Sequence, residues 1–66
     1  MPTISKKLAA YLKLWNELDD LWTSGMGETM QAEDLRNRMD DPWYALSEND
    51  HATFQMMTEE EMRAAR

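Results

Sequence analysis

The residues best suited to catalysis in this sequence are Ser47, Asp50 and His51, which lie close together in the chain. His51 is the single histidine, and histidine has the ordinary pKa that suits a general base near neutral pH. A nucleophilic site also needs a nucleophile within hydrogen-bond reach of the base and a group that orients the base. Adjacent helical residues point about 100° apart, so Asp50 and His51 should not face each other. We therefore predict no catalytic residue and no enzymatic activity.

The acidic segment 40–50 (DDPWYALSEND) has the composition of a calcium-binding loop but not its spacing. Such a loop needs acids at alternate positions, a central glycine and a closing glutamate. Here Pro42, Trp43 and Tyr44 occupy ligand positions, and the segment contains no glycine. The chain has no cysteine and one histidine, which leaves no ligand set for zinc. We predict no metal site and no cofactor.

The spacing of the apolar residues predicts the helices that position these side chains. Apolar residues recur at steps of four and three along the first part of the chain, at Ile4, Leu8, Tyr11, Trp15, Leu18 and Trp22. This spacing predicts a helix over residues 5–23, capped at its start by Thr3 or Ser5. Gly25 and Gly27 should end the helix, because glycine readily adopts the left-handed conformation that follows a helix.

The rest of the chain also has helical signals. Residues 29–40 should form a second helix, which the pair Asp41-Pro42 ends before starting a new turn. Ser47 predicts the start of a further helix. Thr58 and Glu61 form a capping box (T-x-x-E) that predicts a last helix, although one helix running through Thr58 is the alternative.

These signals predict one all-α domain over residues 1–66. It consists of a long N-terminal helix, a glycine turn, a second helix and a bent C-terminal helical segment, as in a small helical hairpin. The chain has no valine and one isoleucine, so strands lack their preferred residues. The predicted core consists of Trp15, Leu18, Trp22, Leu35, Trp43, Leu46 and Phe54.

The first helix carries more apolar surface than one neighbour can cover. Leu12, Leu14 and Leu21 lie beside its main stripe, whereas Asn16 is expected to face water. A chain of 66 residues hides only about 60% of its extended-chain surface and has no disulfides to add stability. We therefore expect this helix to be contacted on two sides, and the chain to form a two-fold homodimer or to dock on a larger protein.

Aromatic and methionine side chains are the best candidates for a protein interface. Tryptophan and tyrosine are enriched among interface hot spots, and methionine adapts to irregular surfaces. The predicted interface residues are Leu8, Tyr11, Leu12, Trp22, Tyr44, Met56 and Met57. We expect a non-enzymatic protein-binding module, such as an inhibitor, adaptor or accessory subunit.

Charge narrows the choice of partner. The net charge of the chain is −6. Residues 1–13 contain three lysines and no acidic residue, so residues 14–66, with four arginines and thirteen acidic residues, carry −9 (4 − 13). We therefore expect no direct binding of nucleic acid or of an anionic membrane. We expect a protein partner with a basic surface. The alternative is an acidic nucleic-acid mimic that blocks a DNA- or RNA-binding protein. Lys13 interrupts the apolar run that follows Lys6-Lys7, so we expect a cytoplasmic protein without a signal peptide.

Overall fold

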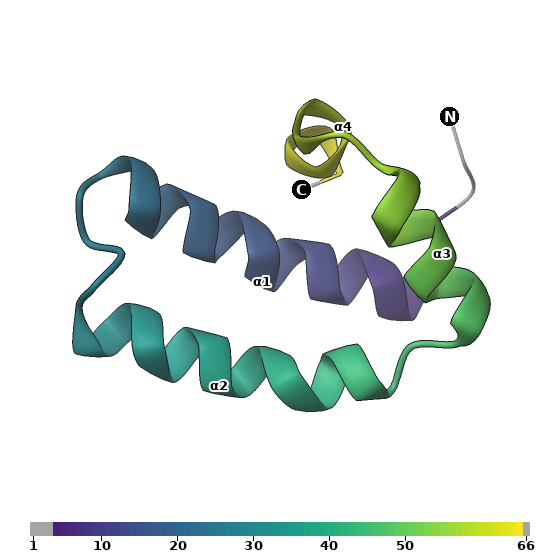
Figure 1. Cartoon of the computed structure of the whole chain (residues 1–66), viewed down its shortest axis with the longest axis horizontal. Coiled ribbons are helices and arrows are strands. Elements are labelled where there is room, and N and C mark those ends of the chain that lie inside the picture. Colours follow the sequence, from purple (N-terminus) through teal and green to yellow (C-terminus); the bar gives the residue numbers. More distant parts are fainter. Residues whose placement is uncertain (1–3, 66) are drawn as a thin grey trace.

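The computed structural model describes residues 4–65, and this part of the chain contains four helices and no strand. The helices are α1 (Lys6–Thr23), α2 (Met30–Tyr44), α3 (Glu48–Met56) and α4 (Glu59–Ala64). α1 and α2 form an antiparallel hairpin. α3 crosses the end of this hairpin where α1 begins and α2 ends, and α4 lies on the side of α1 away from α2 (Figure 1). The all-α hairpin prediction is confirmed. None of these described helices combines the length and the apolar character needed to span a membrane.

Each helix begins directly after a serine or threonine whose hydroxyl oxygen accepts a backbone N–H of the first turn. The pairs are Ser5 with Leu8, Thr29 with Ala32, Ser47 with Asp50 and Thr58 with Glu61. Of the two caps predicted for α1, Ser5 is the one used, and Thr3 lies outside the described residues. The capping box at Thr58 is confirmed, and the alternative of one continuous helix is wrong because Met57 is extended (ψ 141°).

The turn between α1 and α2 closes as the glycines predict. Gly25 has a φ of 80°, in the left-handed region where a side chain would be strained. The Met26 N–H donates to the Leu21 carbonyl at 2.7 Å, and the Gly25 N–H donates to the Trp22 carbonyl at 3.2 Å. This pair of bonds is a Schellman motif, which satisfies carbonyls that the helix end would otherwise leave without partners.

One helix boundary differs from the sequence prediction. α2 does not end at Asp40 but continues through Pro42 to Tyr44. Proline lacks the N–H that would donate to the Arg38 carbonyl, so the helix loses one hydrogen bond near its end. The Trp43 ring that follows packs against the rings of Tyr11 and Phe54, and this tertiary contact outweighs the local preference for a break.

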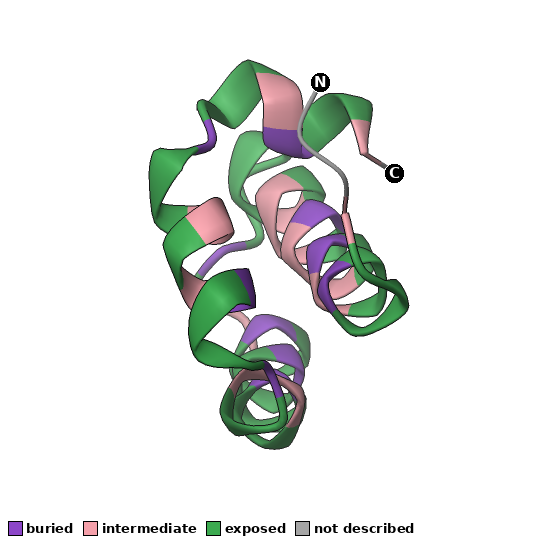
Figure 2. Cartoon of the chain, turned by 90° about the vertical axis from the view of Figure 1, so that its right-hand side faces the viewer, coloured by how far each residue is buried: buried purple, intermediate pink, exposed green. Residues whose placement is uncertain are grey.

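The core lies where α1 meets the C-terminal half of the chain. Its buried apolar residues are Leu8, Leu12, Leu46, Met57 and Met62, and a second buried row on α2 consists of Ala32, Leu35 and Met39. The burial pattern in Figure 2 shows the buried positions of α1 facing the other helices. α1 is contacted by α2 on one side and by α4 on the other, as its apolar width predicts.

Two sets of residues depart from the predicted assignments. Leu35 and Leu46 are buried as predicted, and Trp15, Leu18, Trp43 and Phe54 are half-buried, but Trp22 remains 53% exposed and is not a core residue. Conversely, Leu8, Leu12 and Met57 were predicted at an interface and are buried within the chain itself. A partner of the folded chain cannot reach them, so the predicted interface does not include these three.

Candidate functional site

Ser47, Asp50 and His51 all make structural contacts at helix ends. The His51 ring stacks on Trp43 with 4.3 Å between ring centroids, and its Nε2 lies 2.8 Å from the Trp43 carbonyl oxygen. A carbonyl only accepts hydrogen bonds, so Nε2 carries a proton and donates a hydrogen bond to the Trp43 carbonyl near the end of α2. The buried Asp50 carboxylate accepts a hydrogen bond from the Ser5 hydroxyl at 2.9 Å. These contacts join helix ends. Within residues 4–65, no cluster of three or more His, Cys, Asp or Glu residues could hold a metal ion.

Three aromatic rings meet where α1, α2 and α3 come together. The ring centroid of Tyr11 is 5.2 Å from that of Trp43 and 5.4 Å from that of Phe54. The ring centroids of Trp43 and Phe54 are 5.3 Å apart, and the angle between the two ring planes is 74°. Tilted and edge-to-face pairs at these distances contribute about 0.5–1.5 kcal/mol each beyond their buried area. The cluster therefore forms a rigid wall at one end of the hairpin.

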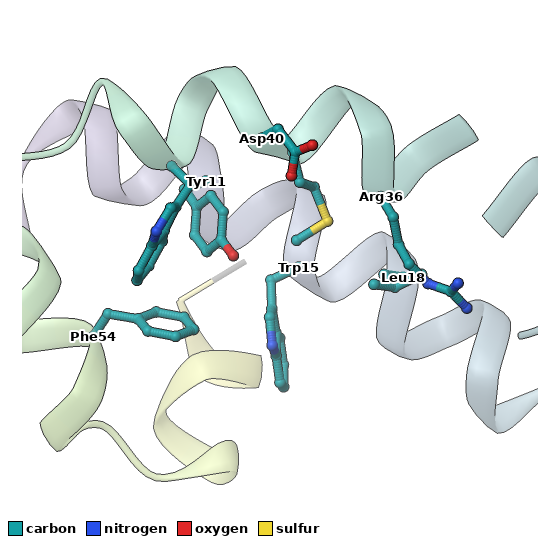
Figure 3. Close-up of a pocket in the computed structure, with 8 residues that line it drawn as sticks. Tyr11, Trp15, Leu18, Arg36, Asp40 and Phe54 are labelled. Atoms are coloured by element: carbon teal, nitrogen blue, oxygen red, sulfur yellow. The ribbon is translucent and has the colours of Figure 1, made fainter. Parts of the chain in front are cut away.

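An open groove of about 420 Å³ lies beside this wall. It is lined by Tyr11, Trp15, Leu18, Arg36, Met39, Asp40, Trp43 and Phe54. Figure 3 shows the Trp15 and Phe54 side chains extending into this space, with Arg36 and Leu18 at the opposite end from Phe54. A second hollow of about 210 Å³ continues from Trp15 and Leu18 to Asp19 and Trp22.

The two hollows share Trp15 and Leu18 and therefore lie next to each other along α1. We call six of the apolar residues that line the two hollows the aromatic strip: Tyr11, Trp15, Leu18, Trp22, Met39 and Phe54. The eleven steps along the helix from Tyr11 to Trp22 correspond to about 16 Å. Four of the six strip residues come from α1, so a single rigid helix sets most of its shape.

Trp22, at the far end of the strip, is held in place from two sides. The backbone of Gly27 lies against the indole ring, so closely that a β-carbon at this position would come within 2.4 Å of a ring atom. On the ring's face, the Arg36 guanidinium lies 5.6 Å from the centroid, a cation–π distance. An Arg36 nitrogen, Nη2, also donates to the Gly27 carbonyl at 2.6 Å. Trp22 is thus exposed and yet fixed in orientation.

The charged groups along the strip carry both signs. Arg36 and Asp40 lie on α2 along the first hollow, and Asp19 lies on α1 along the second. Arg63 of α4 donates to the Asp19 carboxylate at 3.0 Å. Burial raises the pKa of the Tyr11 hydroxyl above its ordinary value of 10.0, and the negative charge of Asp40 raises this pKa further. Both effects disfavour the phenolate, so Tyr11 is neutral at physiological pH.

Asn16 fixes α4 beside the strip. It was expected to face water, but it is almost fully buried. Its Nδ2 donates to the Leu12 carbonyl at 2.9 Å and to the Met62 carbonyl of α4 at 2.8 Å. The prediction was wrong because amphipathic patterning places asparagine at the surface. Here the Met62 carbonyl of α4, 46 residues further along the chain, accepts a hydrogen bond from the buried side chain.

The remaining predicted interface residues are spread over the molecule. Tyr11 and Trp22 belong to the aromatic strip. Tyr44 and Met56 are 80% and 84% exposed, but they lie at the ends of α2 and α3 and line neither hollow. Trp15 and Phe54, which were assigned to the core, pack half-buried against it and also line the groove, as does the half-buried Leu18. The excess apolar width of the first helix was the signal for such a surface.

No protein-family model, curated protein or solved structure gives a significant match to this sequence. The functional conclusion therefore rests on the geometry of the aromatic strip.

Proposed function

We propose that this chain is a non-enzymatic protein-binding module, acting as a small inhibitor, adaptor or accessory subunit, and that the aromatic strip is its contact surface. The observation that carries the proposal is the pair of adjoining apolar hollows along α1, with Trp15 and Trp22 among the residues that line them. Interface hot spots are enriched in tryptophan, tyrosine and arginine, and the strip and its rim contain all three.

The strip is also pre-organised for binding. The ring cluster of Tyr11, Trp43 and Phe54 fixes one end, and the contacts of Trp22 with Gly27 and Arg36 fix the other. Immobilising a flexible side chain on association costs about 0.5–1.5 kcal/mol. Side chains that the free protein already holds in place avoid most of this cost.

Outside the strip, the acidic surface favours a partner with basic regions. Residues 14–66 carry a net −9, which speeds the approach of a positively charged protein at low ionic strength. The contact itself would be mostly apolar. We place this activity in the cytoplasm, because a chain without cysteine gains nothing from an oxidising compartment.

A binding experiment with strip variants tests this function. The full chain is immobilised and exposed to an extract of cells that express it, in parallel with Leu18→Glu, which places a charge in the strip. Met30→Glu is the matched control, since Met30 is 86% exposed and lines neither hollow. We expect a protein that wild type and Met30→Glu retain and that folded Leu18→Glu loses.

Salt separates this function from its alternative. Binding through an apolar strip should persist at high ionic strength, whereas binding by an acidic nucleic-acid mimic should fall steeply as salt rises. A retained protein that salt releases and that Leu18→Glu still binds would contradict the proposed contact surface. That result would favour the nucleic-acid mimic.

A further inference from the structure

A third hollow lies on α1, on the side away from the aromatic strip. Its volume is about 270 Å³, and it is lined by Lys13, Asn16, Glu17 and Asp20. Steps of three and four residues place these side chains on one face of the helix. Asp20 and Trp22 are two residues apart, which is about 200° around a helix, so the two faces point in different directions. A ligand in this hollow would therefore leave the strip free.

Asn16 brings a buried hydrogen-bond acceptor to this hollow. The residue is 2% exposed, and both hydrogens of its Nδ2 are used, because Nδ2 donates to the carbonyls of Leu12 and Met62. A carbonyl oxygen cannot donate, so these two contacts fix which branch of the amide is Nδ2 and which is Oδ1. Oδ1 lies on the other branch. Within residues 4–65 it is the one buried side-chain polar atom without a hydrogen-bond partner.

A donor that enters the hollow can satisfy this acceptor. An unpaired buried oxygen is unfavourable, because it has lost its hydrogen bonds with water and gained none in return. The other three side chains that line the hollow, Lys13, Glu17 and Asp20, are exposed. Exposed side chains change rotamer within nanoseconds, so these three can turn aside and admit a donor to Oδ1.

The charges of the hollow favour a donor that is also a cation. Its lining carries two negative charges, on Glu17 and Asp20, and one positive charge, on Lys13. Calcium takes about six to eight oxygen ligands, and the hollow has side-chain oxygens from three residues, so a metal ion fits poorly. A guanidinium group fits better. It is a planar fork of N–H donors, it is more weakly hydrated than an ammonium group, and it can bond several separate oxygens at once.

We propose that this hollow binds the guanidinium group of an arginine side chain. One N–H is donated to Oδ1 of Asn16, and others are donated to the carboxylates of Glu17 and Asp20. The arginine belongs to a protein partner, because within a polypeptide it carries no carboxylate of its own to be repelled by the two acids. The net charge of −6 speeds the approach of such a partner. This site is separate from the strip, so the two proposals can fail independently.

Titration of the full chain with a blocked arginine, N-acetyl-arginine methylamide, tests the site. The Cγ and Nδ2 NMR signals of Asn16 should shift and saturate, because a hydrogen bond to Oδ1 polarises the amide. Glu17→Gln should weaken binding by about 10-fold or more, since it removes a charge-assisted hydrogen bond. Glu33→Gln is the matched control, because it removes the same charge at an exposed position of α2 and should bind as wild type does.

Lys13 provides a second comparison, in the opposite direction. Lys13→Gln removes the one positive charge of the hollow and should tighten binding by about two- to five-fold. Lys6→Gln makes the same change in net charge at an exposed position outside the hollow, and should leave the affinity unchanged. A blocked lysine should bind less tightly than the blocked arginine. Leu18→Ala, a change in the strip, should bind the probe as wild type does.

Four results would overturn the proposal. The first is the lack of a saturable shift in the Asn16 signals. The second is equal weakening in Glu17→Gln and Glu33→Gln, which would mean that the probe responds only to net charge. The third is equal tightening in Lys13→Gln and Lys6→Gln, for the same reason. The fourth is tighter binding of free arginine than of the blocked probe, which would contradict a protein as the source of the guanidinium group.

Discussion

The two halves of α1 carry the same apolar spacing but have different surroundings. In the first half, Leu8 and Leu12 are fully buried beneath α3, α4 and the segments that join them. In the second half, Trp15 and Leu18 are half-buried and Trp22 is 53% exposed. α2 runs along both halves, so the difference comes from the C-terminal segments, which bury Leu8 and Leu12 in the first half and only Asn16 in the second.

This contrast shows that an apolar stripe specifies which face of the helix is apolar, and that it does not specify how far the residues of this face are buried. Spacing of four and three residues places side chains on one side of a helix. Whether that side becomes core or stays exposed depends on which other segments pack on it. Here the segments after α2 bury Leu8 and Leu12 and leave Trp22 exposed. The variants below test the covered and the uncovered half of α1 and the contacts near them. They are given in order of decreasing expected effect.

Leu12→Ala should have the largest effect on stability. Leu12 is fully buried, and truncation of a buried leucine costs about 3–5 kcal/mol, comparable to the whole free energy of unfolding of so small a domain. Leu18→Ala, the same change in the uncovered half, should cost about 1–2 kcal/mol. Urea unfolding followed by circular dichroism measures both. Equal losses would show that the two halves of α1 are equally covered.

Asn16→Ala should detach α4 from the hairpin. The change removes the donor to the Met62 carbonyl and should cost about 1–3 kcal/mol. Hydrogen exchange should accelerate in residues 59–64 more than in α2. Asn37→Ala is the control, because Asn37 is exposed on α2. Unchanged exchange in α4 would mean that the contacts of Met57 and Met62 and the Arg63–Asp19 ion pair hold this helix without Asn16.

The two glycines of the turn should respond differently to alanine. Gly25→Ala forces a side chain into the left-handed region and should cost about 1–2 kcal/mol, without touching the strip. Gly27→Ala should instead displace the Trp22 ring, because the new β-carbon would overlap it. Indole NMR signals should therefore move for Trp22 in Gly27→Ala and stay in place in Gly25→Ala. The reverse pattern would contradict the fixed position of Trp22.

Tyr11→Phe should have the smallest effect, visible in alkaline solution. The pKa of Tyr11 is raised by burial and by Asp40, so the unfolded chain loses this proton first as pH rises through 10. The free energy of unfolding should therefore fall above pH 10 and level off beyond the raised pKa. Tyr11→Phe should show a smaller alkaline loss than wild type. Tyr44→Phe, at a position that is 80% exposed, should behave as wild type does.

Local signals in the sequence predicted most of the fold. The caps at Thr29, Ser47 and Thr58 and the turn at Gly25 act over three to five residues, so their effects can be read from adjacent positions. The prediction at Pro42 was wrong because the contacts of Trp43 involve rings from α1 and α3, which local preferences do not include.

The candidate site was predictable in part. The excess apolar width of the first helix indicated a face that is not fully covered, and two of the predicted interface residues, Tyr11 and Trp22, lie in the strip. The predicted interface nevertheless placed Leu8, Leu12 and Met57 there, although they are buried. Periodicity identifies the face of α1 but cannot show which stretch of it α3 and α4 cover.

The sequence by itself determined that this protein is a set of capped helices with a glycine turn, because those features depend on hydrogen bonds and backbone preferences between near neighbours. The tertiary structure alone decided which apolar residues are core, that Asn16 joins α1 to α4, and that Trp22 is held between Gly27 and Arg36 at the surface. These outcomes depend on where distant segments end in space. That placement follows from the packing of all the helices together.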